Sequence, residues 1–405
     1  MLGFPPEHEE EEVSRMGVKR RRRCTARVLY TAALVFAVTI CTAAEENEEP
    51  APPAKQFNVS PFFAPVYTPE LGILFTGGAL FSFSTQPANP DLILSNINAS
   101  LGYSTRSALL FQSLLKTYWL DDTLRVYADL WYKNLRDHYW GVGYANGRYT
   151  EKGGETTSYD RSWWKINPKV YWQFRQYLFA GLNLDFNKTR ARNLSAGVAA
   201  DPYLLGQGTD NYNGGAGLIF MYDSRDLPVN AYTGWYLSGT ATFYGRYLGS
   251  DNTYQIYEID YRQYRQIVRP GSILAWQVYS RFGSETVPWP EMTQIGTPFN
   301  LRGYYWGHYR DIAGIFGLLE YRFKFLTDKT NRFRRYEGMK ESRHGFVTWL
   351  GVGWVGSRMR DLGGNLLPNA GVGYRFEVQP RLNVRVDFGW GVESFGVYVN
   401  FNEPF

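Results

Sequence analysis

Histidines beside carboxylates are the first place to look for chemistry in this chain, because an imidazole oriented by an acid can act as a general base. His308 lies three residues before Asp311, and His138 directly follows Asp137. Either pair could in principle support a hydrolytic reaction. A histidine beside an acid in a loop is far more often a solvated surface group. The sequence therefore predicts a protein that is not an enzyme.

Signals for a bound metal or nucleotide are weak. Beyond residue 44 the chain has three histidines and no cysteine, and His138, His308 and His344 are scattered, so no metal cluster is expected. Residues 351–356 match the GxGxxG string of dinucleotide sites, but that string must be followed by a helix. Here the context is a strand. The sequence predicts no cofactor and no metal.

The elements that carry these residues are β-strands, since apolar and polar side chains alternate from residue 71 onward. In residues 381–391 one face is entirely apolar: Leu382, Val384, Val386, Phe388 and Trp390. The intervening positions hold arginine, asparagine, aspartate and glycine. Residues 372–378, 313–325 and 124–131 show the same period of two. This period predicts strands with one apolar face and one polar face.

Composition favours a membrane barrel over a soluble β-protein. Aromatic residues reach 17%, with 31 Tyr and 41 Gly, while the mean hydropathy is negative. No apolar run of the roughly 20 residues needed for a membrane helix occurs beyond residue 44. A polar average with many aromatic residues fits a transmembrane barrel, in which lipid-facing and lumen-facing residues alternate. A soluble sandwich or propeller is the alternative.

The alternation places fifteen strands. They lie near residues 71–84, 94–104, 107–117, 123–134, 161–174, 177–187, 213–222, 234–246, 254–264, 272–283, 312–326, 344–356, 367–378, 381–391 and 395–402. Single-chain bacterial barrels have even strand numbers. We therefore expect an all-β fold, a transmembrane antiparallel β-barrel of 16 strands over residues 67–405, with one strand hidden in residues 135–160.

The N-terminal region has the pattern of a signal peptide. Residues 19–27 are rich in Lys and Arg, Val28–Ile40 is apolar, and residues 41–44 are small. We expect residues 1–44 to be cleaved, with Met16 as the natural start. Residues 45–66, with five prolines and several acids, are expected to form a periplasmic linker.

A cleaved leader changes the charge and the redox chemistry of the chain. Both cysteines, Cys24 and Cys41, fall in the leader, so the mature chain would have no disulfide. It would carry 36 basic and 33 acidic residues. This near-neutral balance gives no reason to expect nucleic acid as a partner.

Four motifs follow one another along the chain. They are the turn Tyr222–Asp226 with Asp223, Arg225 and Asp226; the loop motif Leu301–Tyr304 with Arg302, Gly303 and Tyr304; the strand Gly317–Phe323 with Glu320; and a final strand with Phe401 and Phe405. In this order they resemble the barrel domain of the BamA/TamA superfamily, also called the bacterial surface antigen family. The resemblance covers residues 67–405 and implies a Gram-negative outer-membrane protein. Residues 45–66 are too short for a POTRA domain, so a member lacking POTRA domains is expected.

The resemblance gives the loop motif a role. In the family the long extracellular loop, here residues 285–311, folds into the barrel, and its arginine meets carboxylates on the inner wall. A guanidinium can hold a carboxylate with two donors, and Glu320 lies on the polar face of its strand, so Arg302–Glu320 is the expected pair. A loop arginine in solvent is the alternative. The family usually has a second carboxylate where this chain has Gly351, so anchoring would need a substitute such as Asp387.

The end of the chain also resembles the family. Phe401 and Phe405 resemble the C-terminal signal by which the assembly machinery recognises outer-membrane barrels. The alternative is a last strand that needs an aromatic residue at the membrane interface.

The resemblance implies a role in outer-membrane protein assembly, insertion or translocation. The first and last strands, expected at 71–84 and 395–402, would pair weakly and open a lateral seam to template client strands. The implied partners are outer-membrane lipids, unfolded outer-membrane clients and a POTRA-bearing partner. The alternative is a stand-alone POTRA-less barrel that acts as a pore, a surface antigen or a lipid-handling protein.

Overall fold

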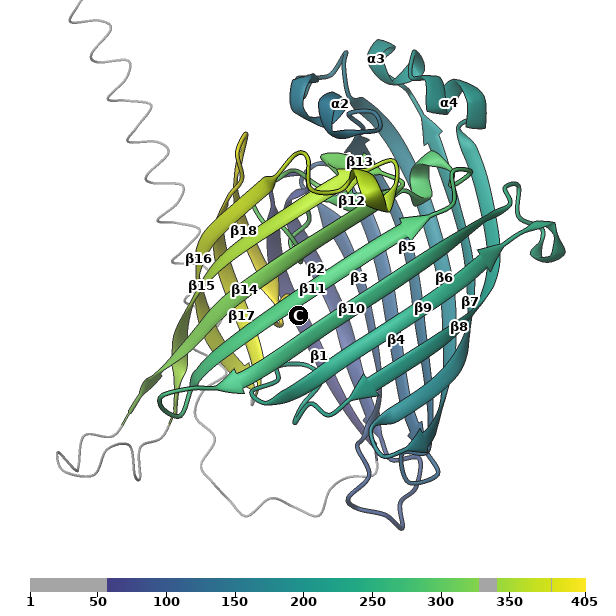
Figure 1. Ribbon diagram of the computed structural model, residues 1–405. Helices are drawn as coiled ribbons and strands as arrows, with labels where there is room; N and C mark the ends of the chain where they lie inside the picture. Colours follow the sequence, from purple (N-terminus) through teal and green to yellow (C-terminus); the bar gives the residue numbers. More distant parts are fainter. Residues whose placement is uncertain (1–56, 328–340, 380) are drawn as a thin grey trace, which may run out of the picture. The chain divides into compact units, whose positions relative to one another are not determined.

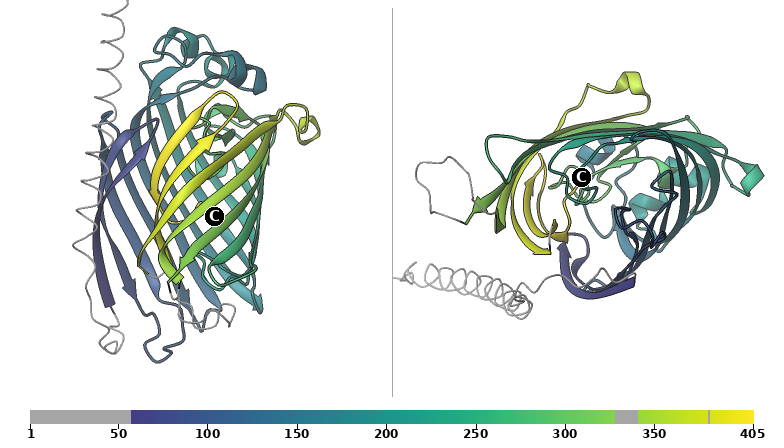
Figure 2. Two further views of the ribbon diagram at one scale, coloured as in Figure 1. Left: turned by 90° about the vertical axis from the view of Figure 1, so that its left-hand side faces the viewer. Right: turned by 90° about the horizontal axis from the view of Figure 1, so that it is seen from below.

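Sixteen strands form a closed antiparallel barrel in the computed structural model (Figures 1 and 2). The structure describes residues 57–327, 341–379 and 381–405. The expected signal peptide, residues 1–44, and residues 45–56 of the expected linker lie outside this range. The predicted fold class and strand number are confirmed.

Neighbouring barrel strands follow the order of the chain, and the last strand returns to the first. The barrel strands are β1 (Phe57–Thr68), β2 (Gly72–Phe83), β3 (Ser95–Ser104), β4 (Leu109–Trp119), β5 (Leu124–His138), β6 (Ser158–Arg175), β7 (Leu178–Arg192), β8 (Asp210–Asp223), β9 (Gly234–Tyr244), β10 (Tyr254–Gln266), β11 (Ser272–Gly283), β14 (Ala313–Leu326), β15 (Glu341–Gly356), β16 (Leu367–Gln379), β17 (Leu382–Trp390) and β18 (Phe395–Phe401). Two short strands, β12 (Thr293–Ile295) and β13 (Tyr309–Asp311), form a separate sheet.

The hidden strand lies at the start of the barrel and not in residues 135–160. Residues 135–160 extend β5 and β6 and contain the short helix α2 (Tyr144–Tyr149). Residues 57–66, expected to be linker, instead form most of β1. Pro61 and Pro65 suggested a linker because proline cannot donate to a ladder. An edge of a sheet tolerates this loss, and β1 is such an edge on one side, as shown below.

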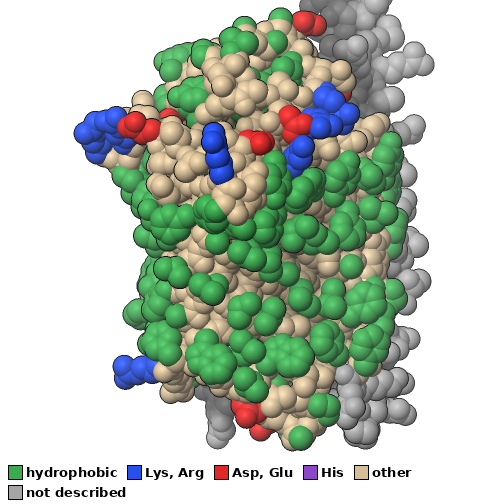
Figure 3. Space-filling view, turned by 90° about the vertical axis from the view of Figure 1, so that its right-hand side faces the viewer, with side chains coloured by type: hydrophobic (Ala, Val, Ile, Leu, Met, Phe, Trp, Pro, Cys, Tyr) green, Lys and Arg blue, Asp and Glu red, His purple; other side chains and the backbone are tan. Residues whose placement is uncertain are grey.

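The period of two sorts side chains between an apolar outer wall and a polar lumen. On the adjacent strands β7 and β8, Leu182 and Leu218 are 63% and 62% exposed, whereas Asn183 and Asp185, at the alternate positions of β7, point inward and are buried. Figure 3 shows hydrophobic side chains spread over the wall, with charged ones gathered near its two ends. An apolar outer band of this kind matches the hydrocarbon layer of a bilayer.

Short helices gather at one end of the barrel, called here the upper end because it is at the top of Figure 1. They include α2, α3 (Ala196–Ala199), α4 (Pro202–Gln207) and the turn η2 (Trp289–Glu291). Trp289 is fully buried there, with its ring against Tyr139 and Tyr159. Within the described residues, no helix is long and apolar enough to cross a bilayer.

A charge on the outer wall tests the assignment of this wall to lipid. We expect Leu218→Arg to lower the free energy of unfolding in phospholipid vesicles by about 2–4 kcal/mol, the cost of arginine on the lipid face of a barrel near its middle. Tyr247→Arg is the matched control, because Tyr247 is equally exposed (63%) but lies in the turn η1 (Arg246–Leu248), beyond the strands. Urea titration gives both values, and equal effects would contradict the assignment.

Candidate functional site: the inner anchor of the long connection

The connection between β11 and β14, residues 284–312, folds back into the barrel. Its two short strands pair with each other, from Thr293 with Asp311 to Ile295 with Tyr309. The tip between them holds the loop motif, and Leu301 and Arg302 are completely buried. The predicted inward-folding loop is confirmed.

Arg302 joins two distant strands of the wall. Its Nη2 donates to Glu320 on β14, and its Nη1 donates to Oδ2 of Asp387 on β17 at 2.8 Å. The guanidinium lies over the indole of Trp349 on β15, with its central carbon 3.6 Å from the ring centroid. The expected Arg302–Glu320 pair is therefore present, and Asp387 supplies the second carboxylate.

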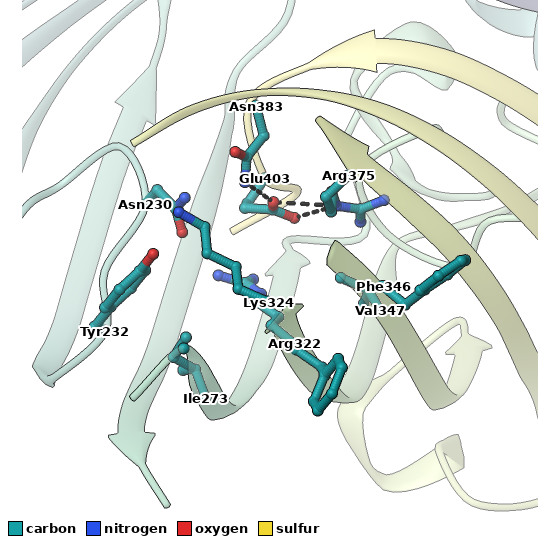
Figure 4. Close-up of a pocket in the computed structure, with 12 residues that line it drawn as sticks. Asn230, Tyr232, Ile273, Arg322, Lys324, Phe346, Val347, Arg375, Asn383 and Glu403 are labelled. Carbon is teal, nitrogen blue, oxygen red and sulfur yellow. Dashed lines mark hydrogen bonds and ion pairs between the residues drawn. The ribbon is translucent and has the colours of Figure 1, made fainter. Parts of the chain in front are cut away.

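The two carboxylates hold further arginines of the inner wall. Glu320 also accepts from Arg322, and Asp387 also accepts from Arg375 and Arg385. Arg375 also forms an ion pair with Glu403, just after β18, at 2.9 Å. Figure 4 shows this last link, with Glu403 between Arg375 and Asn383. The long connection is thus tied to a buried ionic network that spans β14 to β18.

Gly351 makes room for Leu301 of the loop against β15. A Cβ atom at this position would lie 2.9 Å from a methyl carbon of Leu301, and one at Gly353 would lie 2.7 Å from the other. Gly351 and Gly353 of β15 therefore leave the space that the side chain of Leu301 fills. A carboxylate at position 351 would need that space.

Gly303 brings the backbone of the loop against the hairpin of β17 and β18. It has a φ of +119°, and a Cβ atom there would lie 2.7 Å from the backbone nitrogen of Gly391. Tyr304, the third residue of the motif, is buried and donates its hydroxyl to the carbonyl of Pro368 at 2.7 Å. All three motif residues therefore contact the same part of the wall.

The turn motif lies at the lower end and builds its own turn. Arg225 donates to both carboxylate oxygens of Asp223, at 2.8 and 3.0 Å. Asp226 accepts the N–H of Tyr232 at 2.9 Å and pairs with Arg381, in the β16–β17 turn, at 3.1 Å. These contacts shape and position the turn between β8 and β9, and they are separate from the anchor of Arg302.

The end of the chain turns into the lumen. Phe401 is still in β18 and pairs with Val384, but Asn402 has a φ of +62° and reverses the direction. Phe405 is buried, and its ring lies 4.9 Å from the guanidinium carbon of Arg322. An aromatic residue at the membrane interface is therefore the wrong interpretation for Phe405.

The histidines of the two histidine–acid pairs pack against neighbouring groups and form hydrogen bonds. His308 is buried against the rings of Trp140 and Tyr309, and its Nε2 lies 3.0 Å from the carbonyl oxygen of Gly147. Burial lowers its pKa and raises that of Asp311 to about 6. His138 bonds to Thr157 through Nδ1. Residues 351–356 lie in β15, and no cluster of metal-ligating side chains occurs in the described ranges.

Several residues of this site could not be identified from the sequence. Trp349 and Arg375 lie on strand faces that alternation predicts, but their partners are remote in the sequence. Glu70 lies in a turn and Glu403 follows the last strand, so no periodicity marks them, and Tyr398 is one lumen-facing residue among many. Their roles follow from contacts that only the closed barrel creates.

The junction of β1 and β18, called here the seam, is the weakest part of the wall. Within the described residues it consists of one backbone pair, Tyr67 with Val399. By contrast, β1 pairs with β2 at twelve positions, and β17 pairs with β18 at seven. The strands on both sides of the seam are therefore well held by their other neighbours.

The two prolines of β1 lie on the seam side of that strand. The carbonyl of Ile73 in β2 accepts from Thr105, just beyond β3, so odd-numbered residues of β2 bond toward β3 and even-numbered ones toward β1. The register joins even-numbered residues of β1 to even-numbered residues of β2. Odd-numbered residues of β1 thus face β18, and Pro61 and Pro65 remove two donors from this edge.

Comparison with solved structures finds the same fold. BamA from Haemophilus ducreyi lacking POTRA domains 1–3 matches with a TM-score of 0.56 at 11% identity, over 86% of this chain and 70% of that one. CdiB from Escherichia coli matches at 0.55 and 12%, over 87% of this chain and 63% of that one. CdiB from Acinetobacter baumannii matches at 0.51 and 11%, over 86% and 60%.

These comparisons concern the barrel alone. The chain spans less than two thirds of the length of the CdiB structures that it matches. No family model matches the chain, and no curated protein matches it in sequence. The barrel has the fold of the BamA and CdiB barrels.

Removal of the anchoring arginine tests its contribution to stability. We expect Arg302→Ala to lower the free energy of unfolding by about 3–5 kcal/mol, because it leaves buried carboxylates without their partner. Arg302→Lys should retain only part of the free energy of unfolding that Arg302→Ala loses, since one ammonium cannot bridge both acids and lie flat on Trp349. Arg358→Ala, which removes an exposed pair with Glu285, should cost less than about 1 kcal/mol. Similar losses for Arg302→Ala and Arg358→Ala in urea titrations would contradict the anchor.

Gly303→Ala tests the close approach of the loop to the β17–β18 hairpin. We expect a loss of about 2–4 kcal/mol, from the unfavourable φ and the clash with backbone atoms that cannot move aside. Gly206→Ala is the control, because a Cβ atom at this helical position meets nothing within 4 Å. The control should leave stability unchanged or slightly raised. If Gly303→Ala behaves like the control, the loop does not dock as described.

Proposed function

We propose that this chain is a bacterial outer-membrane barrel that assists the insertion or translocation of client proteins through the seam between β1 and β18. The observation that carries the proposal is the single backbone pair at the seam. The fold shared with BamA and CdiB supports it. The upper end would then be extracellular, and the partners would be outer-membrane lipids, unfolded outer-membrane clients and a POTRA-bearing protein.

The seam differs from the sequence-based expectation in one respect. The first strand was expected at residues 71–84, but this segment is β2, whose two edges are both paired. The edge at the seam belongs to β1, from which Pro61 and Pro65 remove donors. Opening at this junction breaks fewer backbone hydrogen bonds than opening anywhere else in the wall.

The edge of β18 is the better template for a client strand. Asn402 donates to the carbonyl of Asn383, so even-numbered residues of β18 bond toward β17 and odd-numbered ones toward the seam. Val397 and Phe401 therefore present backbone groups to the seam and have no pairing with β1 within the described residues. Unlike the edge of β1, this edge contains no proline. A client strand can add to it by β-augmentation.

A stand-alone pore, surface antigen or lipid-handling protein is the alternative. The lumen carries ion pairs such as Lys169–Asp129 and Arg281–Glu258, as a water-filled channel would. The connection 284–312 occupies part of that lumen, however, and favours the seam as the route. We assign no catalytic step to the chain.

Assisted insertion tests the proposed function. The protein in phospholipid liposomes is given a urea-unfolded client barrel, and client folding is followed by the shift of its band in gels of unheated samples. We expect clear acceleration of client folding over empty liposomes. Absence of acceleration by folded protein would contradict an insertase that acts alone.

A disulfide across the seam provides the matched control. Tyr67 and Val399 are backbone partners, at a separation that a disulfide can bridge. With Cys24 and Cys41 replaced by serine, Tyr67→Cys with Val399→Cys should suppress acceleration when oxidised and restore it when reduced. Equal activity in both states would place the route elsewhere than the seam.

A further inference from the structure

The tip of the long connection touches the β18 side of the seam. The N–H of Gly303 donates to the hydroxyl oxygen of Tyr398 at 3.0 Å, and this hydroxyl donates to the carbonyl of Tyr304 at 3.3 Å. Ser394, in the β17–β18 turn, donates its hydroxyl to the carbonyl of Gly303. Tyr398 is 1% exposed, so this contact is sealed from water.

The same tip touches the β1 side. The N–H of Trp306 donates to Oε1 of Glu70 at 3.0 Å, and Glu70 lies in the turn that joins β1 to β2. The ammonium of Lys133, on β5, lies over the indole of Trp306, 4.6 Å from the ring centroid. Three residues beyond Gly303, the loop therefore reaches the opposite side of the seam.

We propose that residues 303–306 form a clasp that holds the seam closed, and that release of Glu70 from Trp306 is the step that permits opening. This inference rests on the proposed function. Arg302 fixes the loop to the wall, so the two strands at the seam can separate only if the loop lets go of one of them. A clasp of this kind compensates for the single backbone pair.

The β1 side is the one that releases. On the β18 side, the loop is held by the hydrogen bonds of Tyr398 and Ser394 and by backbone packing at Gly303. On the β1 side, one hydrogen bond to a carboxylate joins the loop to the turn, and Oε2 of Glu70 is buried without a partner among the described residues. Burial also raises the pKa of Glu70, because desolvation disfavours the ionised carboxylate.

Cysteine accessibility tests the clasp without any client. Ala64 on β1 points inward beside the seam and is 4% exposed, and Ala275 on β11 is fully buried in a strand remote from it. Each is changed to cysteine in a chain with serine at 24 and 41. The rate of alkylation by a membrane-impermeant maleimide in liposomes then reports opening at each place.

We expect Glu70→Ala to raise the alkylation rate at position 64 about tenfold, the effect of losing one hydrogen bond to a charged group. Glu70→Gln keeps an acceptor and should stay within about twofold of the parent. The rate at position 275 should not change. Glu285→Ala is the matched control, because it removes an exposed carboxylate of the same connection away from the seam.

Tyr398→Phe provides an independent variant if Glu70→Ala does not fold. It removes the hydroxyl to which the N–H of Gly303 donates, which loosens the tip that carries Trp306, and it should also raise the rate at position 64 alone. The clasp is overturned if neither variant changes that rate, or if position 275 responds equally. If the variants change the alkylation rate as expected but the protein does not accelerate client insertion, the proposed function is refuted and the clasp stands.

Discussion

A buried guanidinium needs compensating charge, and this constraint organises the barrel. Arg302 has no contact with water, so its charge must be met by acids that are themselves held by other donors. Glu320 and Asp387 meet it from strands that are three places apart in the wall. One loop residue thus fixes both the path of the long connection and the spacing of β14 to β17. The glycines beside it, Gly303 and Gly351, provide the space that this path requires.

The junctions between neighbouring strands of the wall differ in their number of backbone pairs. Within the described residues, fifteen junctions are ladders of at least seven backbone pairs, and the sixteenth is a single pair beside an edge that contains two prolines. A barrel with one weak junction would open there by thermal motion unless something else joined its sides. The long connection lies across this junction because Arg302 holds it to the wall nearby. Anchor and seam are therefore parts of one arrangement, in which a loop replaces the ladder that the strands do not form.

Two sequence-based expectations show where local patterns fail. Residues 57–66 were expected to be a linker because their prolines argue against a strand. Proline fits in a strand only where that strand has an unpaired edge. Whether β1 has such an edge depends on how its two neighbours pair with it in the folded barrel. Phe405 was given a membrane-interface role as one alternative, because the strand before it continues in register. The turn at Asn402 sends it inward, toward Arg322, which is remote in the sequence.

The sequence alone determined the all-β class, fifteen of the sixteen strands and the division of each of these strands into a lipid face and a lumen face. These follow from a period of two, which is a local property of the chain. It also indicated that Arg302 and Glu320 would meet. Only the tertiary structure decided that Asp387 is the second acid to meet Arg302, that the seam lies at β1, and that Glu70 and Tyr398 face the same loop. Such contacts join residues far apart in the chain, and closure of the barrel, not any local pattern, sets which of the inward side chains become neighbours.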